Sequence, residues 1–169
     1  MAELVNNKVA ESGIVTIDLA SLLPSTNIIV FDIKPYLYME LILKEKDFRA
    51  ALLTTDWTIY QDKIVGIICS ADAIIPMWAN MLVVSALNPF ATAVYFGDEK
   101  SIIQQQLIES ISKLNVTEFT NQRVVIKGCG ETYIGETAYV AITQKLRPLV
   151  KSIMYGEPCS TVPVYKRKD

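Results

Sequence analysis

Short apolar runs and longer helical segments alternate along the second half of the chain. Three short apolar runs predict strands, at residues 64–69, 92–96 and 123–127. The first of them is continuously apolar, which is typical of a strand buried on both faces. Three longer segments with helical character follow them, at 73–87, 99–113 and from Gly135-Glu136 to about Ser152. This order predicts an α/β protein in which a mostly parallel sheet is covered by helices.

The first part of the chain predicts shorter elements. Apolar and partly β-branched stretches favour strands at 14–17, 27–33 and 36–43. Good helix formers favour helices at 19–23 and 44–53, and a single turn follows Asp56. Asp18 and Asp56 stand where an N-cap carboxylate accepts backbone N–H groups. Because the N-terminal strands lie close together in the sequence, we expect them to be added to the sheet in antiparallel orientation.

We expect one domain over residues 1–169, since the chain shows no internal repeat, low-complexity tract or linker. From about residue 155 the sequence holds two prolines and a basic tip. Such a composition favours an irregular C-terminal tail or an edge strand.

The region from Ala73 to Gly97 carries no charge and is long enough, by length alone, to span a membrane. Pro76 stands early in it, and Asn88-Pro89 ends any helix. The residues on both flanks are aspartates rather than a cluster of basic side chains. We therefore expect a buried helix followed by a buried strand, and no membrane partner.

Composition excludes several kinds of chemistry. Histidine is absent, which removes Ser-His-Asp and Cys-His catalytic arrangements and every His-ligated metal. The net charge of −2 offers no basic surface to a phosphate backbone, so we expect no nucleic-acid partner. Three cysteines cannot all pair, and residues 1–8 lack the features of a secretory signal. These features predict a cytoplasmic protein with reduced thiols.

The three cysteines are the strongest candidates for a functional site. Cys69 ends the run 64–68 and Cys129 follows the run 123–127, each just ahead of a predicted helix. In one parallel sheet both thiols lie at the carboxyl edge, where α/β proteins bind ligands. Cys159 lies in a loop after the last predicted helix. A loop that leaves the C-terminus of a helix lies at the amino edge of the sheet, unless the chain then crosses the sheet. Convergence of all three thiols stays open at this point.

Three thiolates with one carboxylate, for which Asp72 is nearest in the sequence, are a donor set for tetrahedral zinc without histidine. The same thiols are also able to bind or transfer iron and sulfide. The alternative is structural, because unpaired cysteine packs as a small apolar side chain and is among the most buried residue types. The wide spacing of the cysteines matches no Cys-x-x-Cys signature.

Several motifs resemble a bacterial domain-of-unknown-function family numbered 2480, found mainly in Bacteroidetes. They lie at 43–49, Asp56-Trp57, Cys69–Ala79, Val125–Cys129 and Ser152–Pro163, and the resemblance runs from about Ser12 to Lys166. It implies no established activity. The family's genes often lie beside iron–sulfur assembly genes of the sulfur-mobilisation type, which implies a role in iron–sulfur or sulfur metabolism by association. The ligand set of three cysteines and an aspartate is similar to that of zinc-dependent sulfur-transfer scaffolds.

Three hypotheses follow. The first is a cytoplasmic accessory protein for iron–sulfur or sulfur metabolism, with iron–sulfur assembly proteins as its partners. In this hypothesis the site is formed by Cys69, Cys129 and Cys159 with Asp72, and it either holds zinc or iron or passes sulfur. The second is a non-catalytic binding or scaffold domain with structural cysteines, in which the apolar helix 73–87 serves a homodimer interface. The third is an enzyme with Cys69 as nucleophile, which would need a carboxylate, a lysine or a lowered thiol pKa in place of a histidine base.

Overall fold

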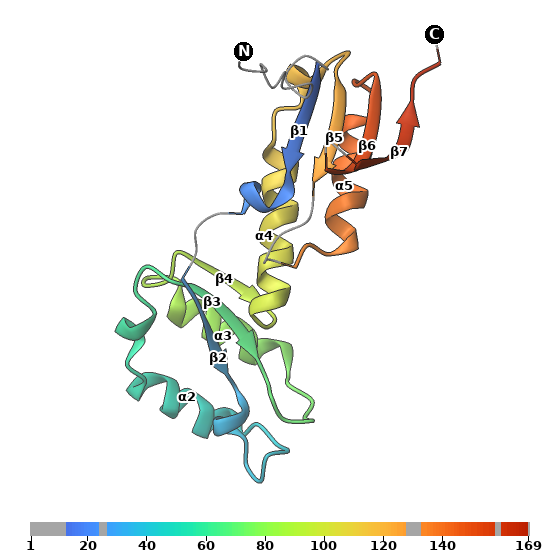
Figure 1. Cartoon of the computed structure of the whole chain (residues 1–169). Helices are drawn as coiled ribbons and strands as arrows, with labels where there is room; N and C mark the ends of the chain where they lie inside the picture. The colour runs from blue at the N-terminus through green and yellow to red at the C-terminus, as the bar shows by residue number, and fades with distance from the viewer. Residues whose placement is uncertain (1–12, 24–26, 128–132, 158–159, 169) are drawn as a thin grey trace, which may run out of the picture. The chain divides into compact units, whose positions relative to one another are not determined.

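The computed structural model describes residues 13–23, 27–127, 133–157 and 160–168 (Figure 1). Strands and helices alternate in it as predicted, so the α/β class is confirmed. The strands form two sheets, one in the order β1-β5-β6-β7 and one in the order β2-β3-β4. The chain divides into two compact units, one of β1 with Gln104–Asp169 and one of Ser25–Ile103, and the boundary falls inside helix α4.

The unit Ser25–Ile103 is built on a three-stranded, fully parallel sheet. Its strands are β2 (Ile28–Asp32), β3 (Ile64–Ile68) and β4 (Ala93–Phe96), and Ile64 lies opposite both Ile28 and Ala93. Its helices are α2 (Glu45–Thr54) and α3 (Met77–Leu87), with short 3₁₀ turns at Lys34–Tyr36 and Trp57–Tyr60. Since the three strands start at the same level, their carboxyl ends also lie together at one edge.

Helices α2 and α3 pack against one face of this sheet. Phe48 and Leu52 of α2 and the buried residues of α3 form a single apolar cluster with Phe31, Val65 and Ile67. Aromatic rings stack on Phe31 within this cluster. The centroid of the Phe31 ring lies 5.5 Å from that of the Tyr36 ring and 5.5 Å from that of the Trp57 ring. Phe48 and Leu52 stand four residues apart in the sequence, which places both on the inner face of α2.

The opposite face of the sheet is closed by a tight approach at Gly66. A Cβ atom built on Gly66 would lie 2.4 Å from the carbonyl oxygen of Gly97 and 2.6 Å from the Cδ1 of Ile102. Only a residue without a side chain leaves room there, so this central strand position requires glycine.

The second unit has three parallel strands and one antiparallel strand. They are β1 (Ile14–Asp18), β5 (Arg123–Lys127), β6 (Ser152–Glu157) and, antiparallel to β6, β7 (Ser160–Lys166). The helices are α4 (Glu99–Lys113) and α5 (Glu136–Leu146), with 3₁₀ turns at Leu19–Leu22 and Thr117–Phe119. Apolar residues of α4 and α5 share one core with β1, β5 and β6. The Nζ of Lys145 donates to the Ile111 and Ser112 carbonyls at the end of α4.

The local predictions for Asp18 and Asp56 are confirmed. The carboxylate of Asp18 accepts the backbone N–H of Ala20 at 3.0 Å, and that of Asp56 accepts the N–H of Thr58 at 3.0 Å. Each aspartate caps the 3₁₀ turn that follows it.

Three details of the prediction are wrong. The strands 64–69, 92–96 and 123–127 do not share one sheet, because β5 pairs with β1 and β6 instead of β3 or β4. The N-terminal strands β1 and β2 are added in parallel, and the antiparallel strand among those described is β7. Residues 36–43 form a tight loop closed by a Tyr38–Ile42 bridge. For the region beyond residue 155, the edge strand is the alternative that forms, because β7 lies at the end of the strand order and pairs with β6.

The charge-free region forms a shorter helix than predicted, followed by β4 as expected. Pro76 is the N-cap of α3, which therefore starts at Met77 instead of residue 73 and ends at Leu87. No helix in the described part of the chain is both long and apolar enough to cross a membrane.

Candidate functional site

Asp32 joins the carboxyl ends of β2 and β3. Its Oδ1 accepts the backbone N–H groups of Lys34 at 2.9 Å and Ser70 at 3.0 Å, and its Oδ2 accepts the hydroxyl of Ser70 at 2.5 Å. Partial burial acts to raise the pKa of Asp32, but the hydrogen bonds from Ser70 and Lys34 outweigh it and hold the pKa below its ordinary value. The ionised carboxylate therefore fixes the start of the loop that leads from β3 to α3.

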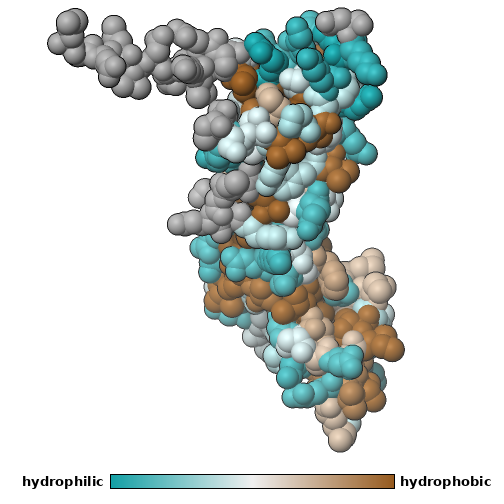
Figure 2. All heavy atoms as spheres, turned by 45° about the vertical axis from the view of Figure 1, so that its right-hand side comes forward, coloured by the Kyte–Doolittle hydropathy of each residue, from teal (hydrophilic) through white to brown (hydrophobic). Residues whose placement is uncertain are grey.

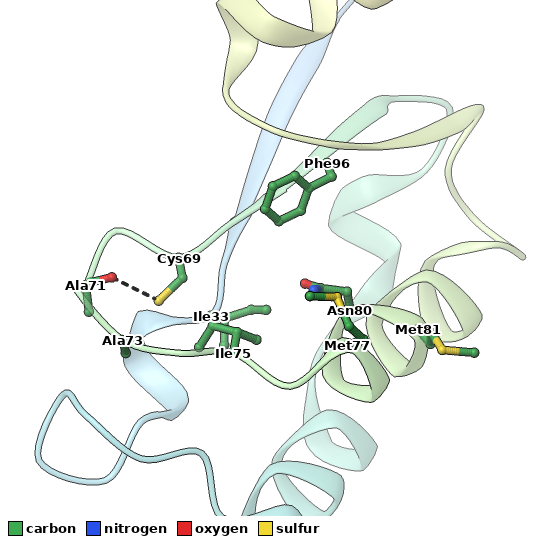
Figure 3. Close-up of a pocket in the computed structure, with 9 residues that line it drawn as sticks. All are labelled: Ile33, Cys69, Ala71, Ala73, Ile75, Met77, Asn80, Met81 and Phe96. Atoms are coloured by element: carbon green, nitrogen blue, oxygen red, sulfur yellow. Dashed lines mark hydrogen bonds between the residues drawn. The ribbon is translucent and has the colours of Figure 1, made fainter.

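That loop forms one wall of a pocket of about 580 Å³ at the carboxyl edge of the sheet (Figure 3). We call it the β3–α3 pocket, and its described lining is Ile33, Cys69, Ala71, Ala73, Ile75, Met77, Asn80, Met81 and Phe96. Most of these side chains are apolar, and the volume suits a small organic molecule. Parallel α/β sheets commonly bind ligands at this edge.

Asn80 is the one amide side chain in the described lining. Figure 3 shows its amide end turned into the space between Phe96 and Ile33. The Oδ1 atom is buried, and the part of the chain that the structure describes offers it no hydrogen-bond partner. A buried carbonyl oxygen without a donor is uncommon in proteins, because it loses its bond to water and gains nothing in return. The Oδ1 atom of Asn80, in the wall of this pocket, therefore has an unmet requirement for a hydrogen-bond donor.

Cys69 lies in the wall of the same pocket. It is a free, half-buried cysteine, and its thiol donates to the carbonyl oxygen of Ala71, with a sulfur–oxygen distance of 3.6 Å. Asp72 follows three residues later, is exposed to solvent and is not part of the described lining. The sequence correctly placed Cys69 at the end of its strand, directly before the loop that leads to α3.

The remaining two predicted ligands, Cys129 and Cys159, lie outside the described residues. The strands that precede Cys69 and Cys129, β3 and β5, belong to different sheets, which removes the reason to expect both thiols at one sheet edge. Within the described ranges, no group of three cysteine, aspartate or glutamate side chains lies close enough to hold a metal ion. The four-residue ligand set therefore stays a prediction.

The strand ends that precede Cys129 and Cys159 are neighbours. Lys127 ends β5 and Glu157 ends β6, these strands are parallel partners, and the Lys127 Nζ lies 3.5 Å from the Glu157 Oε1. The sequence had left open whether the chain crosses the sheet before Cys159. Strand β6 makes this crossing, and it was missed because the predicted helix continued to Ser152.

Sequence reasoning also missed the importance of Asn80. The available signal was the position of this amide in an almost wholly apolar helix. Which polar atom lacks a partner depends on the side chains around it, and sequence spacing does not give that.

The architecture defines an α/β protein with two mostly parallel sheets and an apolar pocket at the carboxyl edge of one of them. A family model described as "Protein of unknown function (DUF2480)" matches residues 3–167, so the chain belongs to this family, and the resemblance seen in its motifs is confirmed. No curated protein and no solved structure matches the chain.

Proposed function

We propose that the protein is a non-catalytic binding protein, and that the β3–α3 pocket receives a small molecule with an apolar body and one hydrogen-bond donor. The observation that carries the proposal is the buried Oδ1 of Asn80, which has no donor within the described residues although it belongs to an otherwise apolar pocket. An apolar body gains free energy from burial against the lining, and a donor that reaches Oδ1 removes the cost of the unpaired oxygen.

The chemistry of the lining favours binding over catalysis. None of the described residues around the pocket carries a carboxylate, an amine or an imidazole, so a substrate there meets no general acid or base. Cys69 is the one nucleophile among them, and its thiol is directed to the carbonyl of Ala71 instead of to a base. A cysteine nucleophile would need such a base or another source of activation.

A matched pair of probes tests this proposal. Indole has an apolar ring system and one N–H donor, and N-methylindole has the same rings without the donor. Two of the five methionines, Met77 and Met81, line the pocket, so their labelled methyl groups report on binding in a nuclear magnetic resonance titration. Met39 and Met154 lie elsewhere in the fold and serve as internal references.

We expect indole to shift the Met77 and Met81 signals and leave the two reference signals unchanged. N-methylindole should bind about tenfold more weakly, because it leaves the acceptor of Asn80 unpaired. Replacing Ala73 by phenylalanine fills part of the pocket and should abolish both responses. Equal binding of the two probes, or shifts that persist in Ala73→Phe, would contradict the proposed site.

The second candidate is a cytoplasmic accessory protein of iron–sulfur or sulfur metabolism, with Cys69, Cys129, Cys159 and Asp72 as ligands of zinc or iron and with iron–sulfur assembly proteins as partners. Two observations favour it. The ion pair of Lys127 and Glu157 holds together the strand ends that lead to two of the cysteines. The third, Cys69, is only half-buried and so is not a fully enclosed core thiol.

Metal analysis tests the second candidate. Protein purified without oxygen or chelator should carry about one zinc or iron per chain, and Cys69→Ser should lower that content while the fold persists. Chelation should raise the alkylation rate of all three thiols together, because a shared metal protects them together. Metal-free protein with three inert thiols would exclude this candidate and leave the binding proposal untouched.

A further inference from the structure

The mouth of the β3–α3 pocket carries an aromatic ring. Phe96, the last residue of β4, lines the pocket and is 70% exposed. In Figure 3 its ring lies across the pocket from Ile33, and the amide end of Asn80 is turned into the space between them. Figure 2 shows apolar surface, in brown, over the unit Ser25–Ile103, to which these residues belong. A ligand ring placed in this space contacts the Phe96 ring and brings its edge to the Asn80 amide.

The lining of the pocket is rich in sulfur. Three of its nine described residues contain sulfur, namely Cys69, Met77 and Met81, whereas the whole chain has three cysteines and five methionines among 169 residues. The thioether sulfur of methionine is polarisable and makes favourable contacts with the edges of aromatic rings. Branched aliphatic side chains suit any apolar ligand equally, and within the described lining these are Ile33 and Ile75. The enrichment in sulfur therefore favours an aromatic ligand.

From the aromatic and sulfur lining we infer that the ligand of the β3–α3 pocket is a planar aromatic compound that carries its hydrogen-bond donor at the ring edge. The inference rests on the proposed function and narrows its apolar body to one chemical class. The Phe96 ring contacts the ligand ring in an offset-stacked or edge-to-face arrangement, which is favourable beyond the area that it buries. The sulfur atoms of Met77 and Met81 contact the ring margin. A saturated ligand of the same size gains only the burial that both ligands share.

A matched pair of neutral amides tests the inference. Benzamide and cyclohexanecarboxamide carry the same amide donor and have the same non-hydrogen atoms, but the first ring is flat and aromatic and the second is saturated and puckered. Titration of the full chain, followed by the methyl signals of Met77 and Met81, gives both affinities. We expect benzamide to bind about fivefold more tightly, which is the usual size of an aromatic pair contribution. The saturated ring is no less apolar, so apolar burial alone does not produce this preference.

Replacing Phe96 by leucine removes the ring and keeps an apolar side chain at the same place. The preference for benzamide should fall to about twofold or less, while the affinity for cyclohexanecarboxamide stays nearly the same. Because Phe96 is mostly exposed, this change should leave the fold intact. The matched control is Tyr38→Leu, at a half-exposed aromatic residue of the same unit that is not part of the described lining. This control should keep the full preference for benzamide.

Equal affinity for the two amides, or no response to benzamide, would overturn the inference. So would a preference for benzamide that Phe96→Leu leaves as large as Tyr38→Leu does. If one of these results is found while indole still binds more tightly than N-methylindole, the inference falls alone and the proposed function stands. If none of the four probes shifts the Met77 and Met81 signals, the proposed function fails and the inference fails with it.

Discussion

Replacing Asn80 by leucine should stabilise the protein when its pocket is empty. Leucine branches at the same carbon as asparagine, so the change leaves no cavity, and the open pocket beside Asn80 has room for its larger methyl groups. It removes the buried Oδ1 that lacks a donor among the described residues, and leaving such an atom unpaired costs about 1–3 kcal/mol. Leucine also has the higher helix propensity, which adds a few tenths of a kcal/mol within α3.

The assay is urea unfolding of protein that has been refolded from denaturant to remove any bound small molecule. We expect the free energy of unfolding to rise by about 1–3 kcal/mol, which corresponds to about 2–12 °C in the melting temperature of a protein of this size. Asn80→Asp keeps the shape and adds a charge that is partly buried, so it should destabilise at neutral pH. Asn88→Leu, at an exposed position that ends the same helix, should change stability by less than about 0.5 kcal/mol.

A loss of stability in Asn80→Leu would refute the reasoning, because it would mean that the amide already makes a favourable hydrogen bond in the empty protein. The stability advantage of the leucine variant should shrink when the pocket is filled. With indole in excess, the leucine variant should gain less stability than the unmodified protein, because it has lost the acceptor for the indole N–H.

Other predictions concern the frame around the site. Gly66→Ala should cost about 1–3 kcal/mol of unfolding free energy, measured in urea, because its Cβ would meet the Gly97 carbonyl. Ser70→Ala should raise the pKa of Asp32 in a carboxyl titration followed by nuclear magnetic resonance. Because folding lowers the pKa of Asp32, its contribution to stability is complete above the ordinary value of about 3.9 and is lost as the pH falls below it. If residues 1–169 are a single domain, urea unfolding should give the same transition by two probes. Tryptophan fluorescence reports on the unit Ser25–Ile103 alone, and far-ultraviolet circular dichroism reports on the whole chain. Separate transitions would show that the two units unfold independently.

Local chemistry made the individual elements predictable. The carboxylates of Asp18 and Asp56 cap the turns that follow them, as their positions indicated, because capping involves only neighbouring backbone groups. Helix α4 matches its predicted limits, since its apolar stripe is regular and Asp98 precedes it. The end of α5 was less predictable. The helix stops at Leu146, and Ile153 and Met154 beyond Pro148 belong to β6 instead.

Pairing between distant segments was not predictable from the same signals. Nothing in the composition of β5 distinguishes β3 from β1 as its neighbour, because all three are short apolar runs. The expected position of Cys69 and Cys129 at one sheet edge was uncertain for the same reason, because it required β3 and β5 to lie in a single sheet. Cys69 itself was placed correctly, because its position depends only on where β3 ends. The role of Asn80 depends on atoms from several segments, and only the structure brings them together.

The pairing of β1 with β5 has a consequence for the order in which the protein forms on the ribosome. Ile14 lies opposite Arg123, so the first strand to emerge has no partner until about a hundred more residues have been made. At elongation rates of about 5–20 residues per second, that interval is roughly 5–20 seconds. The unit Ser25–Ile103 is complete in the meantime, because all three of its strands lie within the segment made during the wait. Strand β1 is thus left with unpaired backbone groups while the segment behind it folds. Nascent chains stalled before residue 123 should therefore be the species most open to protease and to chaperone capture near their amino end.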